Sequence, residues 1–301
     1  MGGEARRPYA SLAGFYPSNP ASLEKALVDS FLDKRFGPGS LPSERRGEIL
    51  LVGGVVPHAG YSYSGPAAAH FYSLLASARR PDTIVIIGTN HTGYGGYYTT
   101  TTRWDEWATP LGTVKVDKEF IHALLDATSI VEDDYLAHLE EHSIEVQLPF
   151  LQYIYGDGFK IAPIVAKEVS KRLAKDMAAA LREAAERTGR SIMVLASSDF
   201  THHGYIYGYL VFTENIASNV EKLDMKVIDA ILALDTDQFL RTIAETGATV
   251  CGVGAIAALM EYAKTRGRVE AKLLKYYNSA QLTGDEEVAV GYASIAIYLR
   301  E

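Results

Sequence analysis

The sequence predicts an α/β fold, namely an α/β/α sandwich around a mostly parallel or mixed central sheet. Short apolar runs rich in Val and Ile alternate with segments of helical periodicity, which is typical of strands connected by helices. The 301 residues, 48% of them hydrophobic, are enough for a large core, and no internal repeat or convincing domain boundary interrupts them. We therefore expect a single domain over residues 1–301, in which residues 1–20 form an irregular N-terminal arm.

The first half of the chain alternates helices and strands around turn-forming residues. Strands are indicated by short β-branched runs, and helices by polar caps or by a proline in the first turn. On these grounds we expect, in order, a helix over 22–36 capped by Ser22, a strand over 49–56, a helix over 66–75 opened by Pro66, strands over 83–87 and 97–102, and a loop over 104–112.

The second half repeats the pattern with longer helices. We expect helices over 117–127 capped by Asp117, over 140–148 with Pro149 bending or ending it, over 170–187 between Ser170 and Gly189, over 214–234, over 236–245, and from the 250–254 turn to Tyr262. Strands are expected over 159–165, 191–196, 271–278 and 288–299.

The totals narrow the class of protein. A formal net charge of −8 argues against nonspecific nucleic-acid binding. A single cysteine excludes an internal disulfide and predicts a cytoplasmic protein. No apolar run approaches the roughly 20 residues that span a bilayer, and residues 1–8 lack the apolar core of a secretory signal, so we expect neither a membrane span nor export.

Histidine loops follow several of the predicted strands. His58 ends the strand over 49–56, His91 follows the strand over 83–87, and His202 and His203 follow the strand over 191–196. The carboxyl ends of parallel strands form the ligand-binding edge of such sheets, and imidazoles converging from different strands can hold a metal. A single histidine is more often structural, but repeated strand-end histidines, together with His142, predict one shared polar site.

Cys251 is the only thiol, and two glycines follow it at the start of a predicted helix. A helix N-terminus favours the thiolate, whereas a free cysteine is commonly a small buried hydrophobe, so both interpretations stay open. A different site is suggested by His138-Leu139-Glu140-Glu141-His142, which matches the H-x-x-E-H motif of zinc hydrolases. If this segment is helical, His138 and His142 share a face and hold zinc.

Five segments, taken together and in this order, resemble the Memo family. They are Pro57-His58-Ala59-Gly60-Tyr61, Gly88-Thr89-Asn90-His91, Glu141-His142-Ser143-Ile144-Glu145, Ser197-Ser198-Asp199-Phe200 with His202, and Val250-Cys251-Gly252. The resemblance spans nearly the whole chain, and the combined set is specific although each segment alone is not.

Memo proteins are similar in fold to class III extradiol dioxygenases, which are non-haem iron enzymes that open catechol rings. The resemblance implies an extradiol-dioxygenase-like α/β/α domain in which the family's two histidines and one cysteine fall on His58, His91 and Cys251. The dioxygenases use a carboxylate as third ligand. Here a softer thiolate stands in its place, so copper or zinc is admitted beside Fe(II), the leading metal.

The resemblance also places His142, Asp199 and His202 around the same pocket. His142 is then a general acid or base with Glu145 one helical turn away as its orienter, and Asp199 fixes an imidazole tautomer. His202 is the second acid/base group. His203 is its alternative, because neighbours in a loop rarely point the same way.

Two functions follow from the resemblance beside the zinc hydrolase. One is a metal-dependent redox enzyme, dioxygenase-like, that acts on a small molecule. The other is a non-catalytic module that binds a peptide or a small anionic ligand in the same pocket, since related family members are described as signalling adaptors. Prokaryotic genes of this kind are associated with a radical-SAM protein, which implies a functional link to one.

Overall fold

The computed structural model describes residues 4–43, 49–167 and 170–300. Its fold is built on one large sheet. The strands of this described part are β1 (Ala5–Arg6), β2 (Leu51–Val56), β3 (Thr83–Thr89), β4 (Tyr98–Thr100), β5 (Glu106–Thr109), β6 (Gly112–Val116), β7 (Val131–Asp133), β8 (Lys160–Ala166), β9 (Ile192–Ser197), β10 (His202–His203), β11 (Val269–Asn278) and β12 (Ala289–Leu299).

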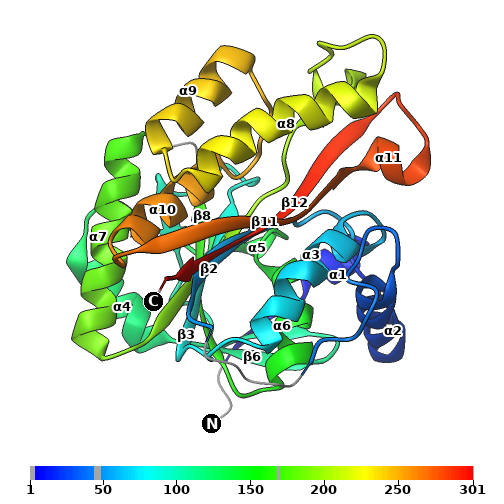
Figure 1. The fold of residues 1–301 in the computed structure, drawn as a ribbon. Helices are drawn as coiled ribbons and strands as arrows, with labels where there is room; N and C mark the ends of the chain where they lie inside the picture. The colour runs from blue at the N-terminus through cyan, green and yellow to red at the C-terminus, as the bar shows by residue number, and fades with distance from the viewer. Residues whose placement is uncertain (1–3, 44–48, 168–169, 301) are drawn as a thin grey trace.

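Helices cover both faces of this sheet (Figure 1). They are α1 (Tyr9–Leu12), α2 (Pro20–Leu32), α3 (Tyr61–Ala76), α4 (Lys118–Ala127), α5 (Leu136–Leu139), α6 (Leu148–Tyr155), α7 (Lys171–Thr188), α8 (Ile216–Leu232), α9 (Thr236–Thr246), α10 (Val253–Lys264) and α11 (Ser279–Thr283), with 3-10 turns at Glu145–Gln147 and Tyr205–Tyr207. Helices α2, α3 and α6 lie on one face, and α4, α7, α8, α9 and α10 on the other. The predicted α/β/α sandwich is confirmed.

The strand order explains where a site can form. The sheet runs β1-β5-β6-β8-β3-β9-β2-β12-β10, with β11 beside β12 and with β4 bridging β7 and β8. Strands β8, β3, β9 and β2 are parallel neighbours, whereas β12 is antiparallel to β2, so the sheet is mixed. The carboxyl ends of β2, β3 and β9 therefore meet at one edge.

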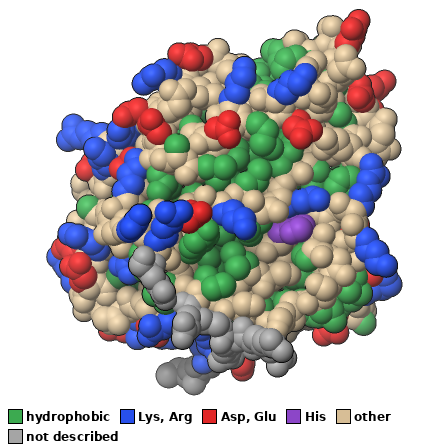
Figure 2. Space-filling model, in the orientation of Figure 1, with side chains coloured by type: hydrophobic (Ala, Val, Ile, Leu, Met, Phe, Trp, Pro, Cys, Tyr) green, Lys and Arg blue, Asp and Glu red, His purple; other side chains and the backbone are tan. Residues whose placement is uncertain are grey.

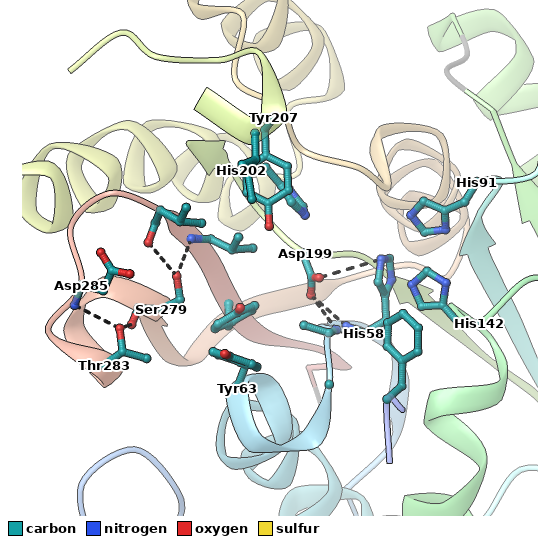
Figure 3. Close-up of a pocket in the computed structure, with 17 residues that line it drawn as sticks. His58, Tyr63, His91, His142, Asp199, His202, Tyr207, Ser279, Thr283 and Asp285 are labelled. Atoms are coloured by element: carbon teal, nitrogen blue, oxygen red, sulfur yellow. Dashed lines mark hydrogen bonds and ion pairs between the residues drawn. The ribbon is translucent and has the colours of Figure 1, made fainter. Parts of the chain in front are cut away.

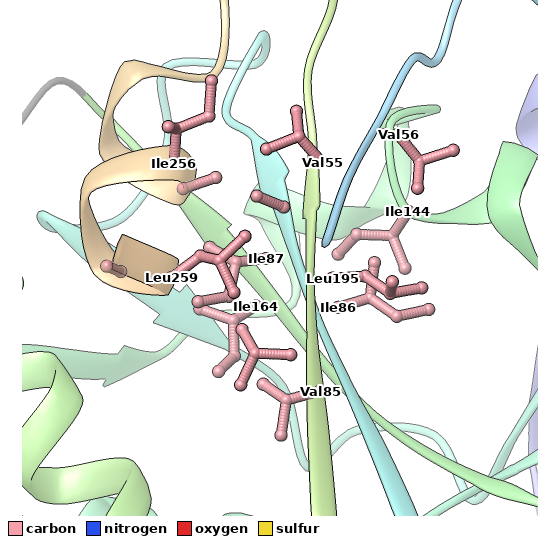
Figure 4. Packing of buried hydrophobic residues seen from close by; sticks show 14 of the residues in the cluster. Val55, Val56, Val85, Ile86, Ile87, Ile144, Ile164, Leu195, Ile256 and Leu259 are labelled. Carbon is pink, nitrogen blue, oxygen red and sulfur yellow. The ribbon is translucent and has the colours of Figure 1, made fainter. Parts of the chain in front are cut away.

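Alternation along the central strands builds the two halves of the core (Figure 4). Val55 and Ile87 face α10 with its Ile256 and Leu259, whereas Val56 and Ile86 face the opposite layer. The glycines inside β2 permit this packing. A Cβ at Gly53 would lie 2.0 Å from the Val194 carbonyl oxygen and 2.7 Å from a Leu259 methyl carbon, so a side chain there would push α10 from the sheet.

Most predicted elements are present with small shifts at their ends. Asp117 and Ser170 cap α4 and α7 as expected, each accepting a backbone N–H of the first turn, and Gly189 ends α7 in the left-handed conformation. The cap of α2 is Asn19 and not Ser22, whose amide donates to the Asn19 side chain. Helix α3 begins at Tyr61, before Pro66, because the Gly60 carbonyl already accepts the amides of the first turn.

Three predictions about irregular segments are wrong. The expected loop over 104–112 is largely a hairpin, in which Trp107 of β5 pairs with Val114 of β6. The N-terminal arm is not wholly irregular, because β1 pairs with β5 and α1 follows it, while residues 1–3 lie outside the described residues. The helix expected over 140–148 is replaced by a turn and a 3-10 segment, and Pro149 lies in the first turn of α6, where its missing N–H costs nothing.

The surface in Figure 2 shows how an exposed sheet edge is protected. Strand β11 pairs with β12 alone among the described strands, and it carries Lys272 and Lys275. Lysine and arginine side chains form a band across this face, over β11 (Figure 2). Charges on an edge strand discourage pairing with another chain. In the described part of the chain, no helix has the length and apolar character required to cross a bilayer.

Candidate metal centre

The turns after β2, β3 and β9 and the turn before α10 meet at one edge of the sheet. They bring His58, His91 and Cys251 together, so that one ligand atom of each lies within 4.8 Å of the others. His142, from the turn before the 3-10 segment, has its ring centroid 5.3 Å from that of His58 and 4.5 Å from that of His91. The strand-end histidines thus share one site with the thiol.

The hydrogen bonds of His58 determine which nitrogen faces the thiol. The Ser197 hydroxyl lies 2.6 Å from the Ser143 carbonyl and 2.8 Å from Nε2 of Gln147, so it donates to the first and accepts from the second. Its remaining lone pair accepts from Nδ1 of His58 at 3.2 Å. Nε2 of His58 is then the ligand nitrogen, and it lies 3.2 Å from the Cys251 sulfur.

Glu141 orients His91 in the same way. Its buried carboxylate lies 2.9 Å from Nδ1 of His91 and accepts the backbone amides of His91, His142 and Ser143 at 2.7 to 2.9 Å. Nε2 of His91 therefore remains for a ligand. The same bonds hold the turn that carries His142 and Ser143 against the His91 turn.

A second group with metal-ligand spacing consists of His91, Glu141 and His142. Its carboxylate and the Nδ1 of His91 already satisfy one another, so this group supports the first as an outer layer and suits a metal less well. Glu145, predicted to orient His142, does not serve that purpose. It is fully buried and pairs with Arg6 at 2.6 Å. Glu141 contacts Nδ1 of His91 instead. Its position directly before His142, a histidine of the predicted site, was the sequence signal that could have indicated it.

The charges of the site follow from these contacts. Burial alone would lower the pKa of His91, but interactions with Cys251 and Glu141 raise it to about 10. Burial alone would raise the pKa of Glu141, but His91 and the neighbouring amides hold it at about 2. Burial would also raise the pKa of the Cys251 thiol, yet His58 and His91 hold it well below its usual range. The site therefore favours a thiolate beside a protonated His91.

His142 is held as a neutral ring. It lies between Phe15 and His91, with ring centroids 4.0 Å and 4.5 Å away and interplanar angles of 20°. Burial, followed by the positive charges of His58 and His91, lowers its pKa to about 3. At neutral pH its uncharged imidazole has one N–H to donate and one nitrogen to accept a hydrogen bond, but with this pKa it is only a weak base.

Asp199 supports the loop that carries His58. Its Oδ1 accepts the backbone amides of His58 at 2.8 Å and of Ala59 at 3.3 Å, while its Oδ2 lies 3.9 Å from Nε2 of His58. The predicted role of Asp199 in fixing the imidazole tautomer belongs to Ser197 instead, because Ser197 contacts Nδ1.

The two adjacent histidines of β10 point to different places. Nδ1 of His202 lies 2.9 Å from the Phe200 carbonyl and 3.1 Å from the Thr249 carbonyl, so it carries the proton and Nε2 is an acceptor. His202 lines the cavity described below. His203 is buried, and its Nε2 accepts the Phe212 amide at 3.1 Å, so it is not the alternative to His202.

The H-x-x-E-H segment does not bring its two histidines together as a helix would. Helix α5 ends at Leu139, so His138 and His142 do not share a helix face. His138 is fully buried, its Nε2 lies 3.0 Å from the Thr99 carbonyl, and its ring packs edge-on against Trp107. Its surroundings are those of a structural histidine.

A cavity of about 540 Å³ opens from the histidines (Figure 3). His58, His91, His142, Asp199 and His202 line one end. The other end extends over tyrosines and over the segment around α11, residues that the sequence motifs did not indicate, among them Tyr63, Tyr207, Ser279, Thr283, Asp285 and Tyr292.

Comparison with known proteins agrees with this architecture. The family model described as Memo, Memo-like protein, matches residues 7–296. A MEMO1 family protein of Methanopyrus kandleri is 41% identical over 281 residues, which cover 93% of this chain and 95% of that protein. One from Desulfurococcus amylolyticus is 43% identical over 286 residues, covering 95% and 96%, and one from Methanothermobacter thermautotrophicus is 40% identical over 292 residues, covering 97% and 99%. The chain therefore belongs to the Memo family.

Proposed function

We propose that this protein is a metal-dependent redox enzyme that acts on a small molecule, with His58, His91 and Cys251 as the ligands of one divalent metal. The observation that carries the proposal is the convergence of these three ligand atoms within 4.8 Å. Ser197 and Glu141 hold the Nδ1 sides of the two imidazoles, which leaves both Nε2 atoms for the metal. Fe(II) is the leading metal, with copper or zinc as the alternatives that a thiolate admits.

The donor set suits a catalytic metal better than a structural one. Three protein ligands leave positions open for a substrate, whereas structural zinc sites are closed by four. When bound, an Fe(II) or copper ion would supply Lewis-acid and electron-transfer chemistry at the end of the cavity. The thiolate adds negative charge that the carboxylate of an extradiol site would otherwise supply.

The residues around the proposed metal exchange protons with the substrate and limit the access of water. His142 faces the site as a neutral imidazole, and Nε2 of His202, whose Nδ1 faces two backbone carbonyls, is the ring nitrogen left to bond a substrate hydroxyl at the cavity wall. Phe15 covers one face of His142 and keeps water from it. Asp199 holds the His58 turn in place through two backbone amides.

A binding module is the second candidate. Beside the cavity, Tyr205 and Ile206 are 86% and 70% exposed, and Ile206 also lines the cavity. Exposed apolar side chains at the mouth of a pocket favour contact with a peptide or another protein. We also propose a functional link to a radical-SAM protein, which the family resemblance supports. A cytoplasmic location is proposed as well, and the single cysteine supports it.

The experiment that tests the metal site is metal analysis after anaerobic purification and separate reconstitution with Fe(II), copper and zinc. We expect one equivalent in the wild type, and loss of stoichiometric binding in His58→Ala and Cys251→Ala. His122→Ala is the matched control, because His122 is exposed on α4. Full retention of metal in both site variants would overturn the assignment. Oxygen uptake with Fe(II) and a catechol panel is a separate test, in which turnover supports the enzyme over the binding module.

A further inference from the structure

The two ends of the cavity beside the proposed metal centre differ in charge. Among the described residues that line it there is no lysine or arginine; the imidazoles of His58 and His91 lie at one end with Asp199, and the Asp285 carboxylate lies at the other. A bound divalent ion would be balanced by the Cys251 thiolate and by Asp199. The negative charge of Asp285 is then not balanced by the metal, and Asp285 lies at the end of the cavity away from His58, His91 and His142 (Figure 3).

Two largely buried side chains in the wall of this cavity each have a polar atom that makes no hydrogen bond to a described residue. Tyr292 is 3% exposed, and its hydroxyl makes no hydrogen bond to a described residue. Asp199 is also 3% exposed, and its Oδ2 has only Nε2 of His58 nearby, at 3.9 Å, since Oδ1 takes both backbone amides. Both side chains line the cavity, so a ligand there can supply the missing hydrogen bonds, and the Asp199 carboxylate accepts only from a donor.

The walls between the two ends are aromatic. In Figure 3, Tyr207 and Tyr63 lie on opposite sides of the space that leads from Asp199 towards Ser279. Their rings are 42% and 46% exposed, and Tyr292 completes the wall. Tyrosine faces attract ammonium groups, and the attraction strengthens when a carboxylate lies nearby.

The polar end beyond the tyrosines can take a donor but offers an anion little. The Asp285 carboxylate accepts one backbone amide through Oδ1, from Glu287 at 2.8 Å, and Oδ2 remains for a ligand. The Asp285 amide is already engaged by the Thr283 hydroxyl at 3.1 Å. A phosphate or carboxylate here would meet negative charge without a cationic partner, which disfavours the anionic ligand expected of a signalling adaptor.

We propose that the cavity binds a small cationic molecule, an amine attached to an aromatic or hydroxylated body, with its ammonium group between the tyrosines and Asp285. Its oxygen-bearing head then lies towards the histidines. Only this placement of the head depends on the proposed metal function. The choice of a cation over an anion depends only on the end of the cavity formed by the tyrosines and Asp285.

Three probes with one ring and different side-chain charge test the choice. They are tyramine (cationic), para-ethylphenol (neutral) and para-hydroxyphenylacetate (anionic), titrated by calorimetry into the full chain, both metal-free and loaded with Zn(II). We expect tyramine to bind most tightly and the anion most weakly in both forms. Tightest binding of the anion, or no tyramine binding at millimolar concentration, would overturn the proposal.

Variants locate the charge. Asp285→Asn should weaken tyramine about two- to fivefold, the size of one exposed ion pair, and leave para-ethylphenol unchanged. Tyr292→Phe should weaken all three probes. Asp126→Asn, which removes an exposed carboxylate from α4, is the control with the same change in net charge. If Asp285→Asn and Asp126→Asn behave alike, the assignment of the ammonium site is wrong.

A further comparison tests whether the oxygen-bearing head of the ligand lies at the proposed metal. Dopamine differs from tyramine by one ring hydroxyl, so a metal at the histidine end should tighten dopamine binding more than tyramine binding. If tyramine binds more tightly than the anion but Zn(II) does not favour dopamine over tyramine, the ligand head does not contact the metal. The proposed metal function is then contradicted, while the preference for a cation is supported.

Discussion

The Cys251 sulfur lies 3.2 Å from Nε2 of His58, although 193 residues separate the two in the chain. His58 comes from the end of β2 and Cys251 from the turn before α10, so their contact depends on α10 packing closely over the sheet. A Cβ at Gly252 would lie 2.4 Å from the Ser198 Cβ. The glycine after Cys251 is therefore required for the close approach that brings the thiol to the imidazole.

This contact predicts a thiolate in the metal-free protein. The pKa of Cys251 is held well below its usual range despite burial, chiefly by His58, so alkylation by iodoacetamide should vary little between about pH 6 and pH 8. His58→Ala should restore a rise of roughly tenfold per pH unit, as for an ordinary thiol. Because the chain has one cysteine, mass spectrometry gives the rate directly. A wild-type profile that follows free glutathione would contradict the prediction.

Metal binding should release protons from the imidazoles. The pKa of His91 is raised to about 10, so its ring carries both protons at neutral pH, and a metal must displace one of them. The apparent Zn(II) affinity should increase with pH between about 6 and 9, approaching tenfold per unit for one displaced proton. Calorimetry in two buffers with different ionisation enthalpies measures the number released. An enthalpy independent of the buffer would contradict this expectation.

Glu141 should set metal affinity without touching the metal. Glu141→Gln weakens the hydrogen bond that orients His91, and loss of such partners typically lowers metal affinity about 10- to 100-fold. Competition with a chromophoric chelator measures the change. Glu140→Gln is the control, because Glu140 is the exposed neighbour of Glu141 in the chain. Equal affinities of the two variants would show that Glu141 does not orient the site.

The N-terminal arm should depend on one buried ion pair. Arg6 and Glu145 are 1% and 0% exposed and lie 2.6 Å apart, and Glu145 also accepts the Tyr16 hydroxyl at 2.6 Å. Arg6→Met leaves the Glu145 carboxylate buried without its partner, which should lower the free energy of unfolding by about 3–5 kcal/mol. Urea denaturation measures this. Arg7→Met, at an exposed neighbouring position, should change it little, and a similar loss in both variants would refute the assignment.

Asp224 should make stability depend on pH. Burial raises the pKa of this carboxyl to about 6, although hydrogen bonds from Thr201 and Tyr276 oppose the shift. Because the folded-state pKa exceeds the unfolded value of about 3.9, the folded protein holds this proton more tightly. The stabilisation is therefore complete below about pH 4 and is lost as the pH rises through about 6.

The isosteric variant Asp224→Asn should remove this dependence. It should be more stable than the wild type at neutral pH, by up to about 3 kcal/mol, and the difference should shrink towards pH 4. Unfolding free energies at several pH values check it. Asp229→Asn, on the exposed side of the same helix, is the control. A stability difference that does not change with pH would exclude Asp224 as its source.

Local pattern was sufficient for most of the elements. The caps at Asp117 and Ser170 and the strand at β3 depend on neighbouring residues, so the sequence was enough to predict them. The hairpin of β5 and β6 was missed because its pairing depends on partners elsewhere in the sheet. The helix expected before Pro149 was wrong, because a turn and the 3-10 segment Glu145–Gln147 stand in its place and α6 begins only at Leu148.

The residue types of the site were likewise visible, since histidines recur at strand ends and the motifs resemble the Memo family. The role of each residue could not be predicted, because it depends on distances between segments that are far apart in the chain. Ser197 and not Asp199 contacts Nδ1 of His58, Glu141 and not Glu145 orients a histidine, and His202 faces the cavity while His203 does not.

By itself, therefore, the sequence determined the fold class, the family and the residues that gather at the carboxyl edge of the sheet. Turns, caps and periodicity act over a few residues and can be read locally. Only the tertiary structure decided the tautomers, the charges and the cationic preference of the cavity. These depend on burial and on contacts between residues such as Cys251 and His58, which meet only once α10 and β2 have packed.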